Sequence, residues 1–278
     1  MTASVLATAP RPPATGKVPP LPDHLSPSAI KEYLTCPLKY YFGRIAHIEK
    51  FVPANLHVGK AVHEAIRFFN LATWRGEDAS KDRVLGKYDE LYITLEESEG
   101  PVEYKNVEHR DAIKQMGFNL VETFLESDAA ALTDKPRGVE VRVRERFDES
   151  PVPILGIIDY VRPGNIPVDY KTIGSSPNLN NETWGHQIQL TAYQLLTERA
   201  TGERVTGTEL VFLVKNKKPK VIRHVIAPAN AAQIARFWTM VAAVINGLQE
   251  GRFHPQPGMH CSWCQYRAEC AKFKGHTV

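Results

Sequence analysis

The chain has 278 residues, of which 43% are hydrophobic and 23% are charged, as is typical of a soluble globular protein. The net charge is only +3, so charge by itself does not indicate a nucleic-acid partner. No apolar run approaches the roughly 20 residues of a membrane-spanning helix. The N-terminus also lacks the basic and apolar regions of a signal peptide. We therefore expect a cytoplasmic protein with no membrane partner.

Residues 1–24 are rich in Ala, Pro and Thr. This composition buries too little apolar surface for a core, so we predict a disordered tail. Order is expected to begin near Leu25, because Ser26 can cap a helix and Pro27 suits its first position. Cys36-Pro37 is expected to end this helix and to begin another.

Residues 57–74 show the spacing of an amphipathic helix, and two further helices are expected between residues 80 and 127. The buried stripe of the first helix consists of Val58, Val62, Ala65, Ile66 and Phe69. His63 lies beside this stripe, and Gly59 one turn earlier leaves space for a backbone or a ligand to approach it. Taken alone, His63 fits an ordinary helix histidine better than a metal ligand.

Strand signals follow in the second half of the chain. Apolar and polar residues alternate over 139–147, which should pair with 154–161 in an antiparallel meander. Two more strands are expected at 209–214 and 221–226, joined by a basic tip. Strands flanked by helices predict an α/β core preceded by extra helices.

Two helices are expected around the later strands. The first covers 184–200 and follows a polar loop at 174–181; the second covers 228–248, with Pro228 at or near its first position. Gln189 and Tyr193 are four residues apart, so they project together from one helix face.

The most informative stretch, 156–172, predicts a β-hairpin that carries two acids and a lysine. Asp169 and Lys171 share one face of the return strand, because side chains alternate along a strand. Asp159 stands opposite Asp169 only if the loop between the strands has an odd number of residues. We therefore predict an odd loop, either Pro163 to Asn165 or its longer form from 162 to 166.

Two facing carboxylates repel each other, and a divalent metal removes that repulsion. Their hard oxygen atoms suit Mg²⁺ or Mn²⁺. A nearby lysine can stabilise charge that develops on a phosphate, or can help to position a water molecule. The alternative is an ordinary hairpin whose acids face solvent.

The chain ends with three cysteines within ten residues, and the remaining cysteine is Cys36. This pattern predicts a metal site in a protein that is not secreted. A site built from one distant thiolate, Cys36, and three thiolates close together in the sequence suits a 4Fe–4S cluster. Zinc usually binds to paired Cys-x-x-Cys motifs instead. His260 keeps a mixed zinc site open, and disulfides are the weaker alternative.

In this order, the motifs resemble the RecB-like branch of the PD-(D/E)XK nuclease superfamily. The pattern is most similar to its iron–sulfur members, the AddB nuclease domain and the CRISPR-associated RecB-like exonucleases. The matching motifs are Leu25-Ser-Pro-Ser28 leading to Cys36, Gly59-Lys-Ala-Val-His63, Gly156-Ile-Ile-Asp159, Asp169-Tyr-Lys171-Thr172, Gln189-x-x-x-Tyr193 and the three terminal cysteines. Aspartate at position 169 departs from the glutamate that is frequent in the superfamily.

The resemblance implies a role for each of these positions. Mg²⁺ or Mn²⁺ would be bound by His63, Asp159, Asp169 and the carbonyl of Tyr170. Lys171 would position or activate the attacking water, and Gln189 and Tyr193 would support the site and place the DNA strand. A structural 4Fe–4S cluster would be held by Cys36, Cys261, Cys264 and Cys270.

The resemblance also implies a fold and an organisation. We expect a restriction-endonuclease-like α/β core, in which helices flank a mixed central sheet, with an N-terminal helical insertion and a C-terminal cysteine region. After the tail, 25–278 would be a single nuclease domain. Its parts would be a mainly helical part at 25–130, the α/β nuclease core at 138–250 and a cysteine-rich region at 251–278 that packs on Cys36.

The implied function is a metal-dependent DNA nuclease, specifically an exonuclease on single-stranded DNA ends. It would act in repair, recombination, phage or CRISPR-related processing, in the bacterial cytoplasm or, if phage-encoded, in that of the host. No helicase signature is present, so unwinding would need a helicase, recombination or CRISPR partner protein. The alternative is a non-catalytic iron–sulfur or zinc module that binds DNA or assembles complexes on a nuclease-like fold.

Overall fold

The computed structural model describes residues 19–98, 100–131 and 135–275, so most of the tail expected at 1–24 lies outside the described residues. The chain forms two compact units. One unit contains the residues up to Lys50, Arg146–Pro153 and the residues from Ala235 onward; the other contains Phe51–Glu145 and Ile154–Ile234. The two units are described separately below.

The second unit is built on a five-stranded mixed sheet. Its strands, in spatial order, are β3 (Gly138–Glu145), β4 (Ile154–Arg162), β5 (Ile166–Ile173), β6 (Thr208–Val214) and β7 (Lys220–Ile226). Only the central pair, β5 and β6, is parallel; the other neighbours are antiparallel. A parallel pair needs a crossover, which here is helical. The expected α/β class with a mixed, helix-flanked sheet is therefore confirmed.

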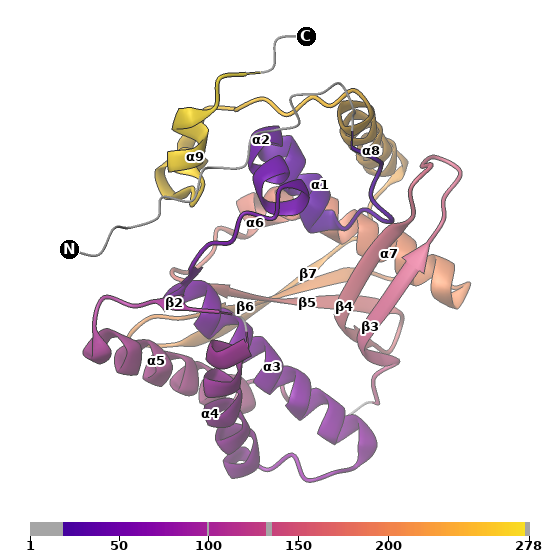
Figure 1. Ribbon diagram of the computed structural model, residues 1–278. Coiled ribbons are helices and arrows are strands. Elements are labelled where there is room, and N and C mark those ends of the chain that lie inside the picture. Colours follow the sequence, from indigo (N-terminus) through magenta and orange to yellow (C-terminus); the bar gives the residue numbers. More distant parts are fainter. Residues whose placement is uncertain (1–18, 99, 132–134, 276–278) are drawn as a thin grey trace, which may run out of the picture. The chain divides into compact units, whose positions relative to one another are not determined.

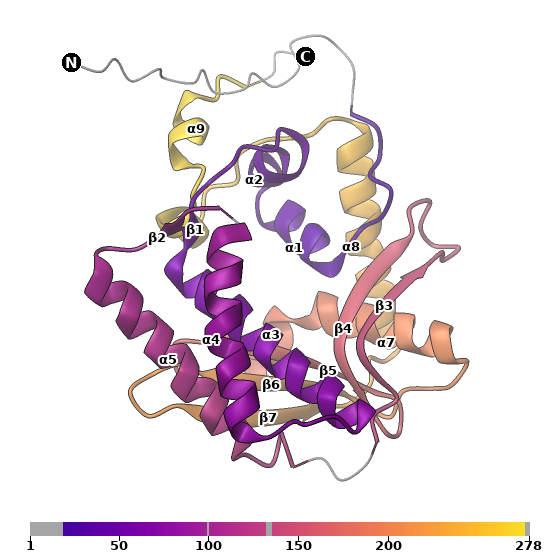
Figure 2. The same cartoon turned by 60° about the horizontal axis from the view of Figure 1, so that its bottom comes forward.

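Helices cover both faces of this sheet. Figure 1 shows one face covered by α3 (Ala54–Arg75), α4 (Lys81–Ser98) and α5 (Val107–Leu125), and the other by α6 (Leu179–Gly185) and α7 (Gln187–Thr201). Figure 2 brings α3, α4 and α5 to the front of the sheet. Strands β1 (Val52–Pro53) and β2 (Val102–Glu103) form a small parallel pair. No helix in the described ranges is long and apolar enough to cross a membrane.

The faces of the strands explain this arrangement, because successive side chains point to opposite sides. Tyr170 and Val211 belong to the large apolar core formed with α3, α4 and α5. Leu210 and Phe212, the neighbours of Val211 in β6, pack instead with Leu190 of α7. Both faces of the central strands are thus buried.

The first unit contains short helices and the chain's four cysteines. Its elements are α1 (Pro27–Thr35), α2 (Pro37–Tyr40), the π-helical turn η1 (Tyr41–Ile45), η2 (Met259–Trp263) and α9 (Arg267–Lys272), and it shares α8 (Ala231–Gln249) with the second unit. Ser26 accepts a hydrogen bond from the Ala29 amide at 3.2 Å, so the expected capped helix start is confirmed. The expected helix junction at Cys36 is confirmed as well.

Two expected helix boundaries are wrong. The loop expected over 174–181 is partly helical, because the Asn178 side chain accepts a hydrogen bond from the Asn181 amide and starts α6. The helix expected from 228 begins at Ala231, because Asn230 and Gln233 cap each other's backbone amides at 3.0 and 2.9 Å. A reciprocal cap of this kind is a signature of a helix N-terminus, and here it lies two residues after Pro228.

Candidate active site

The hairpin between β4 and β5 sets the register of the two acids. Arg162 pairs with Ile166, which leaves a loop of three residues, and the pairing continues to Tyr160 and Val168. Asp159 and Asp169 are the next position in this register, at the point where the described pairing ends. The predicted odd loop, Pro163 to Asn165, is therefore confirmed.

The Asp169 carboxylate is buried and lies close to the Lys171 ammonium. The Asp169 side chain is 6% exposed, and the Nζ atom of Lys171 lies 2.7 Å from its Oδ2 atom. Asp159 is held by the backbone of the neighbouring strand, because the Tyr170 amide donates a hydrogen bond to its Oδ2 atom at 2.9 Å. The structure thus brings together the two predicted acids and the predicted lysine.

Helix α7 fixes the orientation of Asp169. The Gln189 amide donates to Asp169 Oδ1 at 2.6 Å and to the Tyr193 hydroxyl at 3.0 Å. The Tyr193 hydroxyl in turn donates to the Ile157 carbonyl at 2.5 Å. Gly156 permits this close approach, since a Cβ atom there would lie 3.1 Å from the Tyr193 ring and 2.6 Å from Leu196. Gln189 and Tyr193 share one helix face, as predicted, and link α7 to both strands of the hairpin.

His63 approaches the acids from helix α3. Its Nδ1 atom lies 4.0 Å from Asp159 Oδ2, and its ring packs edge-on against Tyr170 with the centroids 6.3 Å apart. The side chain of Asn70, two turns along α3, donates to the Tyr170 hydroxyl at 3.2 Å. Sequence reasoning missed Asn70; its signal was a polar residue that continues the buried stripe of α3.

Burial and charge shift the pKa values of two of these groups. Burial, followed by the charge of Asp169, raises the pKa of Asp159 to about 8. Burial lowers the pKa of His63 to about 4, against the opposing effect of Asp169. Both shifts favour the neutral forms: a protonated Asp159 in the absence of a metal, and a His63 imidazole that can donate a lone pair.

The donor atoms fit a hard divalent cation. Two carboxylates suit Mg²⁺ or Mn²⁺, and the buried Oδ2 atom of Asp169 accepts no hydrogen bond from the described residues, although Lys171 is close. Among those residues, no three His, Cys, Asp or Glu side chains already stand in an arrangement that could hold a metal ion. The assignment of metal ligands to His63, Asp159, Asp169 and Tyr170 stays a prediction.

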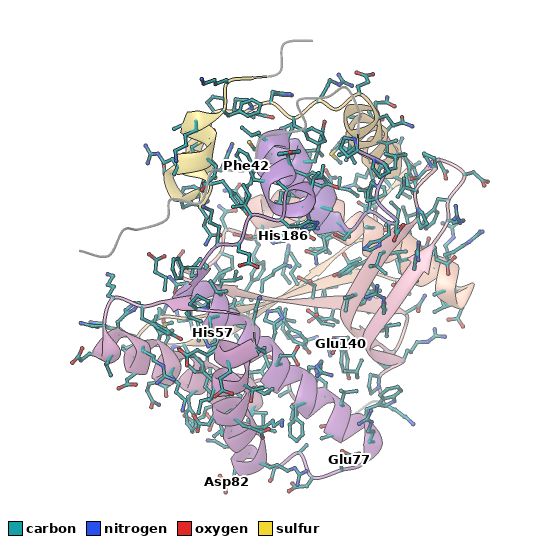
Figure 3. The ribbon with its side chains drawn as sticks, in the orientation of Figure 1. Phe42, His57, Glu77, Asp82, Glu140 and His186 are labelled. Carbon is teal, nitrogen blue, oxygen red and sulfur yellow. The ribbon has the colours of Figure 1, made fainter. Side chains whose placement is uncertain are left out.

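The four cysteines of the first unit line one cavity of about 240 Å³. None is in a disulfide, so the weaker alternative considered above is not formed. Burial raises the pKa of Cys270, and the charges of the other three thiols act in the same direction. Phe42, labelled in Figure 3, lines the cavity together with Leu38 and Ala271, so the thiols lie among apolar side chains.

The chain matches the family model of the PD-(D/E)XK nuclease superfamily over residues 24–271. A similar solved structure is that of a "Putative exonuclease" from Eubacterium rectale, with 15% identity, a TM-score of 0.60, and coverage of 92% of this chain and 90% of that one. A second structure, SSO0001, has 16% identity and a TM-score of 0.36, and covers 89% of this chain and 96% of that one. Comparison with curated proteins found no match. The family match spans both acids, the lysine and all four cysteines: this chain belongs to the PD-(D/E)XK nuclease superfamily.

Proposed function

We propose that this chain is an Mg²⁺- or Mn²⁺-dependent deoxyribonuclease that acts as an exonuclease on single-stranded DNA ends. The observation that carries the proposal is the register of the hairpin, in which Asp159 and Asp169 follow the Tyr160–Val168 pair at the next position, with Lys171 2.7 Å from the second acid. Membership of the superfamily supports hydrolysis of a phosphodiester bond, and the exonuclease name of the Eubacterium rectale protein supports the mode of cleavage.

The metal would be held by His63, Asp159, Asp169 and the Tyr170 carbonyl. When bound, it would polarise the phosphoryl oxygen and lower the pKa of water. Lys171 lies beside Asp169, where its ammonium can position the attacking water and offset charge on the phosphate. Gln189 holds Asp169 Oδ1, which leaves the buried Oδ2 atom as the side of the carboxylate that faces Lys171.

The cysteine cavity supports a second proposal, a structural 4Fe–4S cluster held by Cys36, Cys261, Cys264 and Cys270. A volume of about 240 Å³ is more space than a single ion needs. The cations Lys39 and Arg267 also line the cavity, and they would offset part of the negative charge of four thiolates. Zinc at the same cysteines is the alternative, which an iron and zinc assay of anaerobically purified protein separates.

The proposed substrate is DNA, and the proposed setting is cytoplasmic DNA repair, recombination, phage or CRISPR-related processing. In such a setting, a helicase or recombination partner would supply single-stranded ends. The competing function is a non-catalytic module that binds DNA, with the cysteine site as a structural element. Tight DNA binding without any cleavage in Mn²⁺ would favour that function.

The direct test uses linear and circular single-stranded DNA of equal length and sequence. With Mg²⁺ or Mn²⁺, the wild-type protein should degrade the linear strand and leave the circle intact. With EDTA, it should cleave neither substrate. Lys87→Ala is a matched control for the catalytic variants, because Lys87 is a surface lysine paired with Glu90 on α4. Cleavage of the circle at the rate of the linear strand would exclude an exonuclease.

A further inference from the structure

A group of three charged residues borders the hairpin acids on the side of helix α3. Arg67 is one turn beyond His63 on that helix, so the two side chains share a face. The Arg67 Nε atom lies 2.8 Å from Glu64 Oε2 and 2.8 Å from Glu140 Oε2. Glu140, labelled in Figure 3, comes from strand β3.

Glu140 occupies an unusual backbone position. In β3, Val139 pairs with Tyr160 and Val141 with Ile158, so Glu140 is the position across from Asp159. Its φ angle is +51°, which makes it the one non-glycine residue with positive φ inside a described strand. This conformation is strained for a residue with a side chain, and such strain is concentrated at functional sites.

Stability alone does not account for this arrangement. The side chains of Arg67 and Glu140 are 43% and 38% exposed, and ion pairs this exposed contribute little to stability. A left-handed glutamate therefore destabilises the strand by more than the pair is expected to restore. What the arrangement does achieve is a guanidinium one helix turn from His63, held by two carboxylates. One of these carboxylates, Glu140, belongs to the residue across from Asp159.

The guanidinium is suited to a phosphate of the substrate strand. The closest contact of each carboxylate is to Nε, which carries one of the five N–H donors; the other four are on the two Nη groups. Arginine presents such donors as a planar fork that matches a pair of phosphate oxygens. We propose that Arg67, held by Glu64 and the strained Glu140, is a substrate-positioning residue that binds a backbone phosphate next to the one that is cleaved.

This inference rests on the proposed nuclease function, but it is tested separately from it. A fluorescein-labelled single-stranded 20-mer oligodeoxynucleotide is titrated with protein in Ca²⁺ at several salt concentrations, with intact probe verified on a denaturing gel. Arg67→Ala should bind about ten-fold more weakly, and the slope of log K against log salt should fall by about 0.7, the value for one lost contact to a single strand. The matched control is Arg75→Ala, an exposed arginine at the C-terminal end of the same helix.

Cleavage kinetics in Mn²⁺ give the second readout. A residue that binds a phosphate not undergoing reaction should raise KM about ten-fold and leave kcat within a factor of about three. Arg67→Lys should recover part of the affinity, because it keeps the charge but loses the fork. An unchanged Kd and salt slope in Arg67→Ala, or a loss of kcat at constant KM, would overturn the inference. A wild-type protein that binds the probe but never cleaves would overturn the proposed function instead, and the binding titration would still decide the role of Arg67.

The Glu140→Gly variant distinguishes a role of Glu140 in positioning Arg67 from a role in stabilising the fold. Glycine adopts φ of +51° without strain, so this variant should match or exceed the wild-type protein in Tm. Its KM should nevertheless rise several-fold, because Arg67 loses one of its two carboxylates. A higher Tm with unchanged KM and Kd would show that Glu140 has no positioning role, which would overturn that part of the inference.

Discussion

The two predicted sites of this protein are held together in different ways. The hairpin acids lie on adjacent strands of a five-stranded sheet, and each is fixed by hydrogen bonds to the protein itself. The cysteines lie on short elements: Cys36 separates α1 from α2, Cys261 lies in the five-residue turn η2, and Cys270 lies in the six-residue helix α9. The first site should therefore stay ordered without its metal, whereas the second should depend on the bound group for its stability.

Several side-chain contacts hold the segment that carries the three C-terminal cysteines. Tyr266 packs against Phe42, with ring centroids 5.7 Å apart, and the Lys50 ammonium lies 2.6 Å from Glu269. A Cβ atom on Gly43 would lie 3.2 Å from the Tyr266 hydroxyl, so a glycine in η1 allows the ring to approach. The Lys50 ammonium also lies over the Tyr266 ring, 5.5 Å from its centroid, and the Tyr266 hydroxyl donates to the Ile48 carbonyl at 3.4 Å. Contacts of these kinds are modest restraints for a ten-residue loop with three thiols.

The largest expected effect is on activity at the hairpin. Lys171→Ala should lower cleavage at least about 10³-fold, because the phosphate and the water lose their nearby cation. The iron content should match that of the wild-type protein and of Lys87→Ala, whereas the Tm should fall, because the buried Asp169 carboxylate loses the cation 2.7 Å away. A rate within about ten-fold of wild type, measured on single-stranded DNA in Mn²⁺, would contradict the role given to Lys171.

The largest expected effect on stability is at the cysteines. Cys264→Ser should lose iron and lower the free energy of unfolding by at least about 3 kcal/mol, or roughly 6–12 °C in Tm. Ser262→Ala, at an exposed position between Cys261 and Cys264, is the matched control and should change neither quantity. Full retention of Tm and iron in Cys264→Ser would remove Cys264 from the ligand set and would make both sites equally independent of a bound group.

The raised pKa of Asp159 predicts a pH-dependent effect at the hairpin. Since burial and Asp169 raise this pKa to about 8, the contribution of Asp159 to stability is complete below about pH 4 and is lost as the pH rises through 8. Asp159→Asn stays neutral at every pH. Without divalent metal, its stability advantage over the wild-type protein should grow as the pH rises from 5 to 9.

Thermal unfolding at these two pH values measures this difference directly. Asp128→Asn serves as the control, because the Asp128 side chain is 77% exposed. If Asp159→Asn is no more stable than the wild-type protein near pH 9, the two acids do not repel each other in the way that the proposed metal site requires.

The smallest expected effect on cleavage comes from Tyr193, which supports the site through Gln189. Tyr193→Phe removes the hydroxyl that links Gln189 to the Ile157 carbonyl, so cleavage should fall about ten-fold, for a cost of roughly 1–2 kcal/mol. Tyr88→Phe is a matched control, because Tyr88 is also buried and its hydroxyl donates to the Lys114 carbonyl at 2.9 Å. Both variants should lose similar stability, and only Tyr193→Phe should lose activity. Equal activity in the two variants would reduce Tyr193 to a packing role.

The same contrast explains what could be predicted from the sequence. The register of Asp159 and Asp169 follows from the parity of a turn rich in Pro, Gly and Asn, which is a local property. The start of α6 could not be predicted with equal ease, because Asn178 fits a loop as well as a cap until its bond to Asn181 is seen. The left-handed backbone of Glu140 contradicts its local preference altogether, since nothing near it in the sequence indicates the contact with Arg67.

The most direct test of the account measures both sites in one sample of Asp159→Ala. Wild-type protein and variant are purified anaerobically, and each is assayed for iron, zinc, the visible spectrum and cleavage of linear single-stranded DNA in Mn²⁺. The account predicts that the variant loses cleavage while it keeps about four irons per chain and a broad visible band. Cleavage at the wild-type rate in the variant would contradict the assignment of the active site to the β4–β5 hairpin.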